Sequence, residues 1–559
     1  MSPFTQPYHD AVAQLTGPGA PFEVTTCVIE GHALKTFSKA YTHLSDYLNN
    51  GRQHGDKLLL QYQGKCWSFD EFFTAVDQLS YWMVNEKGVG PGVPVAIAMR
   101  NRPEWLVAFV AIINVGAVAV PLNSWGRGAE LEQGLEDSEA KLLICDGPRW
   151  AFVCENRHDM SALIVDGDVD TSQQTNFSVV MDSVRPEPMT TPAIDAHAPA
   201  ILMFTSGTSG RPKGVLLSHF NCCQALMNLE FIGAATYMTN QDAMNIQLAS
   251  STPPKTLLAV PLFHISGLFS QFIVNMHHGR SLYLMYKWDA NEALRLLRQE
   301  DITVLMGAPV MMMELLAHPE LNPRDAEQLT NVSSGGAATP AALSKLYASK
   351  AGAAFPGGGW GMTETLGTGA AFTGYFCEHR PSASGFPSPI MEFRFLGEDG
   401  KPAAPSAPGE IHVRSSAAIQ HYYTGSSEGL HEGWLATGDI GYISDEGLLF
   451  ICGRVKDMII RGGENIYPSE IEACLMTLPG CLDAAVVGKP DAKWGEAVAA
   501  VIQVALLSEG NHDAVIDHCK QQLAAFKVPA YVTFTEKPLP RNALRKLLKK
   551  RIVKEYFPR

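Results

Sequence analysis

The sequence predicts a layered α/β protein: a large N-terminal domain of α/β subdomains with a small β-rich region, then a small α+β C-terminal domain. The first observation is length, because 559 residues exceed what one hydrophobic core usually supports. The second is that apolar runs between residues 55 and 330, such as VPVAIAM (93–99) and AKLLICD (140–146), alternate with helical patterns. The third is a change to short strands with turn signals from 391 to 453, followed by a new set of helices and strands.

The composition is that of a well-packed globular protein with an excess of acidic residues. Hydrophobic residues make up 46% and charged residues 18%, and Lys+Arg 43 against Asp+Glu 57 leaves a net charge of −14. This charge disfavours nonspecific nucleic-acid binding and requires locally basic sites for any anionic ligand. The cysteines include no C-x-x-C pair, which favours reduced thiols in a cytoplasmic protein.

Two segments bear on targeting. The stretch MSPFTQPYHDAVAQL at the start has no sustained apolar core, which argues against a signal peptide. The run WLVAFVAIINVGAVAVPL (105–122) approaches transmembrane length, but Asn114, Gly116 and Pro121 divide it. We therefore expect a buried helix followed by a buried strand.

The stretch FTSGTSGRPKGVLLSH (204–219) has the composition of a polyphosphate loop. Its glycines let backbone N–H groups face an anion, its hydroxyls add donors, and Lys213 adds a positive charge. It is not a Walker A motif, because Gly214 follows the lysine where a hydroxyl is required. The apolar flanks predict strand, loop, strand, with a helix starting near Phe220. An ordinary flexible hairpin loop remains the alternative reading of this segment alone.

Three further stretches carry residue types that fit nucleotide chemistry. In GGGWGMTET (357–365), Trp360 offers a flat stacking surface and Glu364 a hard oxygen ligand. The segment that starts at Gly433 contains Asp439, which is suited to a ribose diol, and Arg454 close to it in sequence. The last stretch, LPRNALRKLLKK (539–550), brings lysines near the C-terminal end.

As an ordered set these stretches resemble the adenylate-forming superfamily of acyl-CoA synthetases, nonribosomal-peptide adenylation domains and luciferases. The resemblance covers about residues 55–550 and is strongest to bacterial-type fatty acyl-CoA synthetases. In such enzymes a carboxylate attacks the α-phosphorus of ATP to give an acyl-adenylate and pyrophosphate, and a thiol then displaces AMP. The resemblance therefore implies ATP, Mg²⁺ and coenzyme A.

The resemblance also implies roles for individual residues. Thr363 and Glu364 would contact the α-phosphate and magnesium, with Thr205 as a second metal ligand, and Asp439 and Arg454 would hold the ribose. Trp360 stands where many relatives have tyrosine, so it would keep the adenine stacking and lose the hydroxyl. The remaining nucleotide-binding residues would be Ser206, Gly207, Thr208, Ser209, Gly210 and Lys213 at the β- and γ-phosphates, and Gly335, Gly336, Ala337 and Gly361 near the adenine and acyl group.

A mobile C-terminal domain is part of the same resemblance. It implies an N-terminal domain of residues 1–455 and a lid domain of residues 456–559, with a hinge near Lys456. The lid would rotate between the half-reactions, so that one face brings a lysine to the α-phosphate and the other brings the GGEN segment to the thiol tunnel through Gly463.

The catalytic lysine departs from the pattern of the relatives, which usually read P-R-x-x-x-G-K. This chain has PRNALRK, with Arg545 in place of the glycine, and the spacing from Pro540 assigns the role to Lys546. Helical spacing would place Lys546 and Lys550 on one face with Lys549 beside them, so all three stay open. A positioned cation is required because the attack accumulates negative charge.

The segment from Ala243 to Trp288 contains no Asp or Glu, which favours an apolar acyl group over an amino acid with an ammonium to pair. His264 occupies the family's F-H-x-x-G position and would border the carboxylate and thiol route, with simple packing as the alternative. Met306 and Met311–Met313 would line an alkyl tunnel or pack in the core. A medium- or long-chain fatty acid is the expected substrate, and aryl or steroid side-chain acids are the next alternatives.

Free coenzyme A is the simplest acceptor, because no carrier domain follows in the chain. An acyl-AMP ligase that loads a separate carrier protein, a luciferase-like oxygenase, and a nucleotide- or acyl-binding regulator without catalysis are the alternatives. The stretch from 541 to 559 is strongly basic, which suits a solvated helix face or a weak peripheral membrane contact. A homodimer is also left open.

Overall fold

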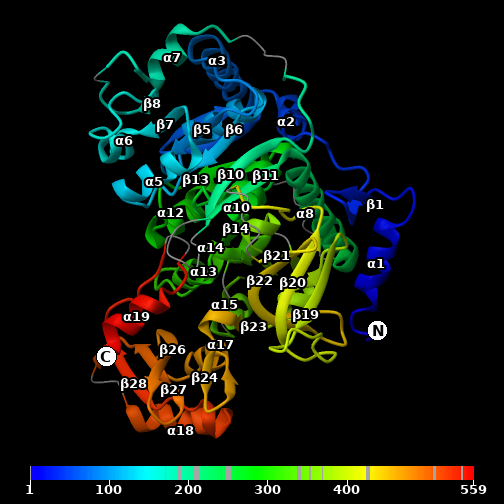
Figure 1. The fold of residues 1–559 in the computed structure, drawn as a ribbon, viewed down its shortest axis with the longest axis vertical. Helices are drawn as coiled ribbons and strands as arrows, with labels where there is room; N and C mark the ends of the chain where they lie inside the picture. The colour runs from blue at the N-terminus through cyan, green and yellow to red at the C-terminus, as the bar shows by residue number, and fades with distance from the viewer. Residues whose placement is uncertain are drawn as a thin grey trace.

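The computed structural model of the protein describes most of the chain, arranged as a large N-terminal part and a small C-terminal part (Figure 1). The described residues are 2–169, 171–186, 191–205, 213–242, 244–245, 253–336, 341–351, 354–367, 369–423, 429–507, 511–542 and 545–558. The large part holds the chain from α1 to β23, and the small part, orange to red in Figure 1, holds β24 to α19. This matches the layered α/β class with a small α+β C-terminal unit that the sequence predicts.

The first large sheet has seven described strands in the order β11-β10-β6-β5-β7-β8-β9. All neighbours are parallel except the β10–β11 hairpin. Strands buried on both faces read as continuous apolar runs, which is why VPVAIAM and AKLLICD become β5 and β7. The strands are β5 (Pro94–Ala98), β6 (Val118–Pro121), β7 (Leu142–Asp146), β8 (Ala162–Val165), β9 (Gln174–Asn176), β10 (Pro199–Thr205) and β11 (Lys213–Ser218).

The second large sheet has nine described strands in the order β18-β17-β16-β15-β14-β12-β13-β3-β4. Its centre, from β16 to β3, is parallel, and antiparallel strands close both edges. The strands are β3 (Leu58–Tyr62), β4 (Lys65–Ser68), β12 (Lys255–Leu258), β13 (Ser281–Leu284), β14 (Val304–Gly307), β15 (Asn331–Ser334), β16 (Phe355–Trp360), β17 (Ala370–Thr373) and β18 (Phe386–Pro387).

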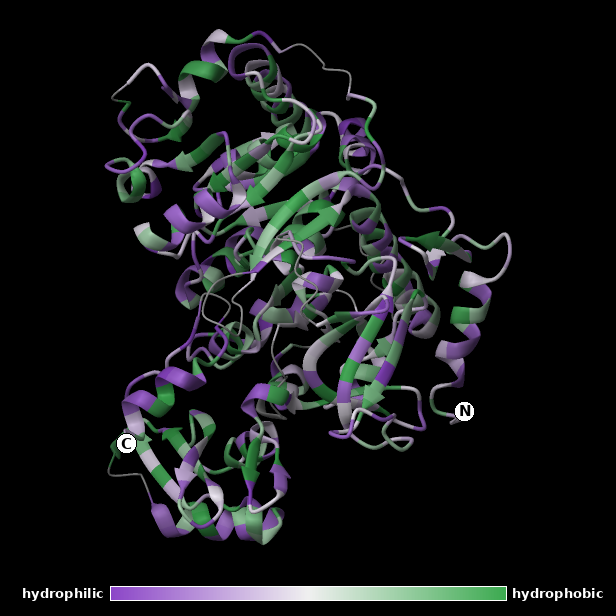
Figure 2. Cartoon of the chain, viewed as in Figure 1, coloured by the Kyte–Doolittle hydropathy of each residue, from purple (hydrophilic) through white to green (hydrophobic). Residues whose placement is uncertain are grey.

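Helices cover these sheets, and α8 contacts both of them, through β11 and β17. One apolar cluster contains residues of both sheets, and Figure 2 shows the hydrophobic residues concentrated on the inner strands. The helices of this part are α1 (Gln6–Thr16), α2 (Leu44–Asn49), α3 (Phe69–Lys87), α4 (Pro103–Asn114), α5 (Gly128–Ser138), α6 (Gly147–Val153), α7 (Phe177–Ser183), α8 (His219–Thr239), α10 (Ile265–Gly267), α11 (Val274–His277), α12 (Ala290–Glu300), α13 (Pro309–Leu316), α14 (Pro323–Glu327), α15 (Ala341–Lys350) and α16 (Tyr375–His379). The hairpin β1 (Val24–Ile29) and β2 (His32–Phe37) and the π-helical turn Leu268–Ile273 complete it.

The run 105–122 forms the buried helix α4 and the buried strand β6, as predicted. The side chains from Trp105 to Ile113 are completely enclosed. Within the described residues, no helix combines the length and the apolar character that crossing a membrane would need.

The β-rich region predicted at 391–453 is a third sheet, in the order β19-β20-β22-β21 with β23 paired to β22. Its strands are β19 (Met391–Leu396), β20 (Gly409–Ser415), β21 (Leu430–His431), β22 (Trp434–Ile443) and β23 (Leu449–Arg454). A short 3₁₀ turn, Val455–Asp457, follows β23 and leads into the small part.

The small part is a sheet with helices on it, in the order β25-β24-β27-β26 with β28 beside β27. Its elements are β24 (Ile459–Arg461), β25 (Glu464–Ile466), α17 (Pro468–Leu475), β26 (Asp483–Asp491), β27 (Gly495–Gln503), α18 (His512–Gln522), β28 (Tyr531–Thr535) and α19 (Lys549–Tyr556). It has its own apolar clusters, formed by residues from Ile459 onward, so its core is separate from that of the large part.

Candidate active site

The glycine-rich stretch lies between β10 and β11, so the two predicted flanking strands are confirmed. Thr205 pairs with Lys213, the last pair of strand residues before the connecting stretch, and Lys213 Nζ lies 5.4 Å from the centre of the Tyr422 ring. The helix α8 begins at His219, where the Ser218 hydroxyl accepts a hydrogen bond from the backbone N–H of Asn221. The predicted phosphate contacts at Ser206, Gly207, Thr208, Ser209 and Gly210 lie outside the described residues, as does Ala337.

Asp439, on β22, connects the second sheet to the third. Its Oδ2 accepts a hydrogen bond of 2.8 Å from the indole Nε1 of Trp360, and its Oδ1 accepts one of 2.5 Å from Nε of Arg454. The side chain is only 11% exposed, so both oxygens need such partners. Trp360 lacks the tyrosine hydroxyl, as the sequence shows, but its indole N–H is a hydrogen-bond donor that the sequence analysis did not assign to Asp439.

Glu364 lies in the 3₁₀ turn Thr363–Thr365, which follows β16. It is 7% exposed, its Oε1 accepts a hydrogen bond of 3.4 Å from the Tyr422 hydroxyl, and burial raises its pKa. The Tyr422 hydrogen bond and the charges of Arg454 and Lys213 oppose that rise. Thr363, beside it, is half-buried. Sequence reasoning missed Tyr422, for which the only signal was a pair of adjacent tyrosines before a turn-like stretch.

Lys546 belongs to the small part but interacts electrostatically with residues of the large part. Burial lowers its pKa, as do the charges of Arg454 and Lys456, while Asp439 and Glu364 raise it. Lys546 is nevertheless exposed, so the desolvation comes from the protein that surrounds the side chain at longer range. We refer to Trp360, Glu364, Asp439, Arg454 and Lys546 together as the Asp439 cluster.

The other two lysines are arranged differently, and the expected helical register is wrong. Helix α19 begins only at Lys549, so Lys546 lies in the loop before it, where Arg545 adopts a left-handed φ of 60°. Lys549 Nζ lies 2.9 Å from Glu472 Oε1 and donates to the Val486 carbonyl, both in the small part. Lys550 is exposed on α19. Lys546 is therefore within electrostatic range of Asp439 and Glu364, whereas Lys549 is paired within the small part.

His264 directly precedes the short helix α10, in the apolar segment that the sequence assigns to acyl binding. Burial lowers its pKa to about 3, and the charge of Lys546 adds to this effect, so the imidazole is neutral at physiological pH. Its Nε2 is buried and has no hydrogen-bond partner in the described part of the chain. A buried ring nitrogen of this kind is free to bind a polar ligand atom.

The methionines near residue 311 favour the packing interpretation. Met311 and Met312 are buried in an apolar cluster of the second sheet, and their methyl groups lie against Gly307 on β14. Met313 packs partly buried against the same cluster, while the Met306 carbonyl accepts a hydrogen bond of 3.5 Å from Gln271. None of these contacts requires an acyl chain.

The remaining predicted residues lie on turns. Gly335 and Gly336 follow β15, and Gly361 follows β16, at the same edge of the second sheet. Lys456 is exposed in the 3₁₀ turn after β23. Gly463, with φ 89°, lies in the turn between β24 and β25, and Asn465 of β25 donates a hydrogen bond to Glu398, which follows β19 of the third sheet.

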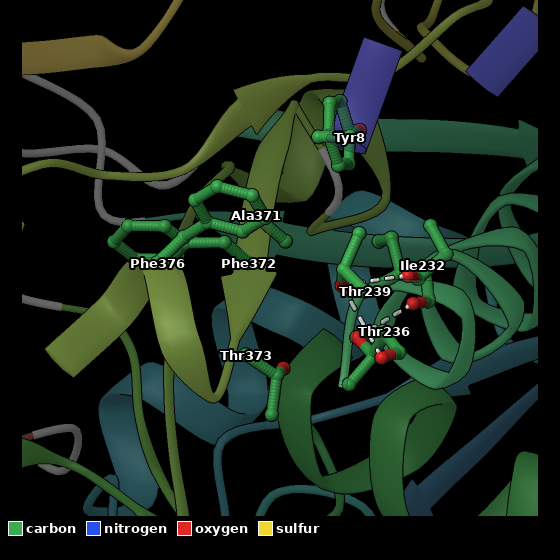
Figure 3. A pocket seen from close by; sticks show the side chains of 9 residues that line it. Tyr8, Ile232, Thr236, Thr239, Ala371, Phe372, Thr373 and Phe376 are labelled. Carbon is green, nitrogen blue, oxygen red and sulfur yellow. Dashed lines mark hydrogen bonds between the residues drawn. The ribbon is translucent and has the colours of Figure 1, made fainter. Parts of the chain in front are cut away.

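A small cavity lies between α8 and β17, with Tyr8 of α1 above it (Figure 3). Its lining is apolar apart from threonines, and the Thr236 and Thr239 hydroxyls donate to helix carbonyls, as the dashed lines show. Its volume of about 10 Å³ is close to the space of one water molecule, so it does not hold an acyl chain in this structure. The lining residues are Tyr8, Ile232, Ala235, Thr236, Thr239, Ala371, Phe372, Thr373 and Phe376.

Comparison with known proteins places this geometry in a family. The chain matches the AMP-binding enzyme over residues 48–423 and the AMP-binding enzyme C-terminal domain over residues 470–546. It is 31% identical to a 2-succinylbenzoate–CoA ligase of Bacillus velezensis, over 89% of this chain and 95% of that protein. It is 30% identical to the long-chain-fatty-acid–CoA ligase FadD13 of Mycobacterium tuberculosis, over 84% of this chain and 89% of that protein.

A solved structure agrees with these matches. The o-succinylbenzoate coenzyme A synthetase of Bacillus subtilis, in complex with ATP and a magnesium ion, superimposes with a TM-score of 0.71 and 27% identity. The superposition covers 90% of this chain and 98% of that one. With both family models matched and relatives aligned over most of its length, the chain belongs to the AMP-binding enzyme family of the adenylate-forming superfamily and is an enzyme of the AMP-forming acid–CoA ligase class.

Proposed function

We propose that this protein is an ATP-dependent acyl-CoA synthetase that activates a medium- or long-chain fatty acid, or a similar apolar carboxylic acid. The carboxylate and ATP give acyl-AMP and pyrophosphate, and coenzyme A then displaces AMP. The observation that carries the proposal is the Asp439 cluster, in which a lysine of the small part interacts electrostatically with two buried carboxylates of the large part. A polyphosphate and an attacking carboxylate need this combination of cation, metal ligand and sugar-binding carboxylate.

Each member of the cluster has a role in the proposed first half-reaction. Lys546 stabilises the charge that accumulates at the α-phosphorus, and Asp439 with Arg454 holds the ribose. Trp360 borders the adenine and orients Asp439 through its indole N–H. Lys213 and Thr205, opposite each other on the hairpin, flank the β- and γ-phosphates.

Magnesium fits the donor set that the structure offers. The described residues contain no cluster of three or more His, Cys, Asp or Glu side chains around one point. Magnesium in such sites is usually bound by one or two carboxylates together with substrate phosphates, so Glu364 with the hydroxyl of Thr205 suffices. When bound, the ion screens the phosphate charges from the incoming carboxylate.

The second half-reaction is proposed to use another orientation of the small part. We place the boundary between residues 455 and 456, with the hinge at Lys456 in the 3₁₀ turn after β23. In the present orientation Lys546 interacts electrostatically with Asp439 and Glu364, and the GGEN segment contacts Glu398. Rotation about the hinge moves Lys546 away from the site and brings the GGEN segment to it, so that Gly463 lines the thiol route beside His264.

The apolar substrate follows from the residues around His264. The π-helical turn Leu268–Ile273 is largely buried. The segment 243–288 contains no Asp or Glu. Related ligases are named for both 2-succinylbenzoate and long-chain fatty acids, so the acyl group must be identified directly. An apolar acyl chain needs no charged partner in this segment, unlike an amino acid.

The experiment that tests the function is a panel of C6 to C18 fatty acids and aryl acids, assayed for coenzyme A-dependent AMP formation. We expect saturable turnover with one range of chain lengths and none with amino acids. Acylation of a carrier protein in place of coenzyme A would identify an acyl-AMP ligase. Absence of ATP–pyrophosphate exchange with every acid would reject the proposal in favour of a binding regulator.

Glu364→Gln removes the buried charge and keeps the shape of the side chain. We expect ATP–pyrophosphate exchange to fall by at least about 10²-fold at saturating ATP, because electrostatic stabilisation of the transition state is lost. Glu392→Gln, which breaks the ion pair with Arg414 in the third sheet, serves as the control and should retain exchange. Equal exchange in the wild type and the Glu364 variant would remove Glu364 from the site.

Lys546→Ala tests the choice between the lysines. We expect acyl-adenylate formation to slow by about 10²–10³-fold, while thioester formation from added acyl-AMP changes little. Lys550→Ala should stay within a few-fold of the wild type, and Lys549→Ala should affect thermal stability more than rate, because Lys549 pairs with Glu472. A large, adenylation-specific loss in Lys549→Ala or Lys550→Ala would move the catalytic role to that residue.

Gly463→Leu tests the second face of the small part. We expect it to block thioester formation and spare ATP–pyrophosphate exchange, because the side chain would enter the thiol route only after rotation. Gly480→Leu is a matched control: it also has a positive φ, at 82°, with no atom within 4 Å of an added Cβ. If both half-reactions fell together in Gly463→Leu and not in Gly480→Leu, the alternating-domain assignment would be wrong.

A further inference from the structure

Arg545 occupies a backbone conformation that suits glycine. Its φ of 60° lies in the left-handed region, which an L side chain adopts at a cost in free energy. The usual motif of related sequences has glycine at this position. A residue that keeps such strain next to the proposed catalytic lysine needs a compensating contact.

The compensating contact crosses from the small part to the large one. The Arg545 guanidinium Nη2 lies 3.7 Å from Oε2 of Glu314, which is on α13. The same carboxylate oxygen accepts a hydrogen bond of 2.6 Å from the indole Nε1 of Trp288. The hydrogen bond from Trp288, in the large part, thus orients the Glu314 carboxylate toward Arg545.

The loop transmits this contact to Lys546. Arg541 pairs with Asp483 at 2.6 Å and also donates to the Arg545 carbonyl, and the Asn542 side chain accepts from the Lys546 backbone N–H at 2.9 Å. These bonds tie Arg545 to Arg541 and Lys546 to Asn542. A shift of Arg545 is therefore passed on to Lys546, the next residue in the chain. The ion pair with Glu314 therefore bears directly on where Lys546 lies.

We propose that Arg545 is a positioning residue: its ion pair with Glu314 holds the small part in the orientation that directs Lys546 to the Asp439 cluster, and it must break before the second half-reaction. The inference rests on the proposed function. It assigns to the Arg545–Glu314 contact the choice between the orientations of the small part in the two half-reactions. Both partners are partly exposed, at 40% and 37%, so water can separate the pair and the contact can be reversible.

The test is a charge exchange between the two partners. Arg545→Glu and Glu314→Arg each place like charges opposite one another, and each should slow acyl-adenylate formation by about 3- to 10-fold, as for a partly exposed pair. The double variant Arg545→Glu/Glu314→Arg restores opposite charges and should return to within about 2-fold of the wild type. Thioester formation from added acyl-AMP should be unchanged or slightly faster in the single variants.

The controls separate orientation from other effects. Arg551→Glu makes the same charge change on the exposed face of α19 and should leave both half-reactions unchanged. If a reversed variant does not fold, as judged by thermal unfolding, Arg545→Gln and Glu314→Gln replace it. In that cycle each single change should slow adenylation, and the double should be no slower than the slower single.

Failure of the inference differs from failure of the proposed function. No rescue in the double variant, additive losses in the glutamine cycle, or equal losses in both half-reactions would overturn the Arg545–Glu314 contact while wild-type ATP–pyrophosphate exchange persists. Absence of exchange in the wild type would instead reject the proposed function. Rescue together with a loss confined to adenylation would support the positioning role, because a purely local effect of a new charge beside Lys546 would remain in the double variant.

Discussion

The buried carboxylate of Asp439 is the constraint around which the candidate site is arranged. A carboxylate that is only 11% exposed is stable only when its oxygens are paired, and here the partners come from different elements. Trp360 ends β16 of the second sheet, and Arg454 ends β23, directly before the turn that leads to the small part. Pairing one carboxylate therefore fixes the second sheet against the third at the point where the small part begins.

The cluster balances charges in a protein whose overall charge is −14. Burial raises the pKa of Glu364, and the charges of Arg454 and Lys213 oppose that rise. Burial lowers the pKa of Lys546, and the charges of Asp439 and Glu364 oppose that fall. Partly desolvated charges interact more strongly than charges in water, so a few residues can create a local site for a polyanion. His264, with its pKa lowered to about 3, adds a neutral polar atom without adding charge.

The small part contributes to this site through a short loop rather than a helix. The left-handed Arg545 and the side-chain contacts of Asn542 end the loop before α19 starts. Contacts across the two parts, Arg545 with Glu314 and Asn465 with Glu398, are polar and lie at the surface. Polar contacts of this kind exchange with water at little cost, whereas a buried apolar interface would oppose rotation.

The sequence alone determined the layered α/β class, the helix and strand at 105–122, the β-rich region and the hairpin around the glycine-rich loop. These features depend on local periodicity and turn chemistry, which neighbouring residues carry. The ordered motifs also predicted that Glu364, Asp439, Arg454 and Lys546 belong to one site. Only the tertiary structure decided that the Trp360 indole donates to Asp439, that Tyr422 contacts Glu364, and that Lys546 precedes the helix while Lys549 pairs with Glu472. Those choices depend on partners up to 79 residues away and on the φ of one arginine, and such contacts leave no periodic signal in the chain.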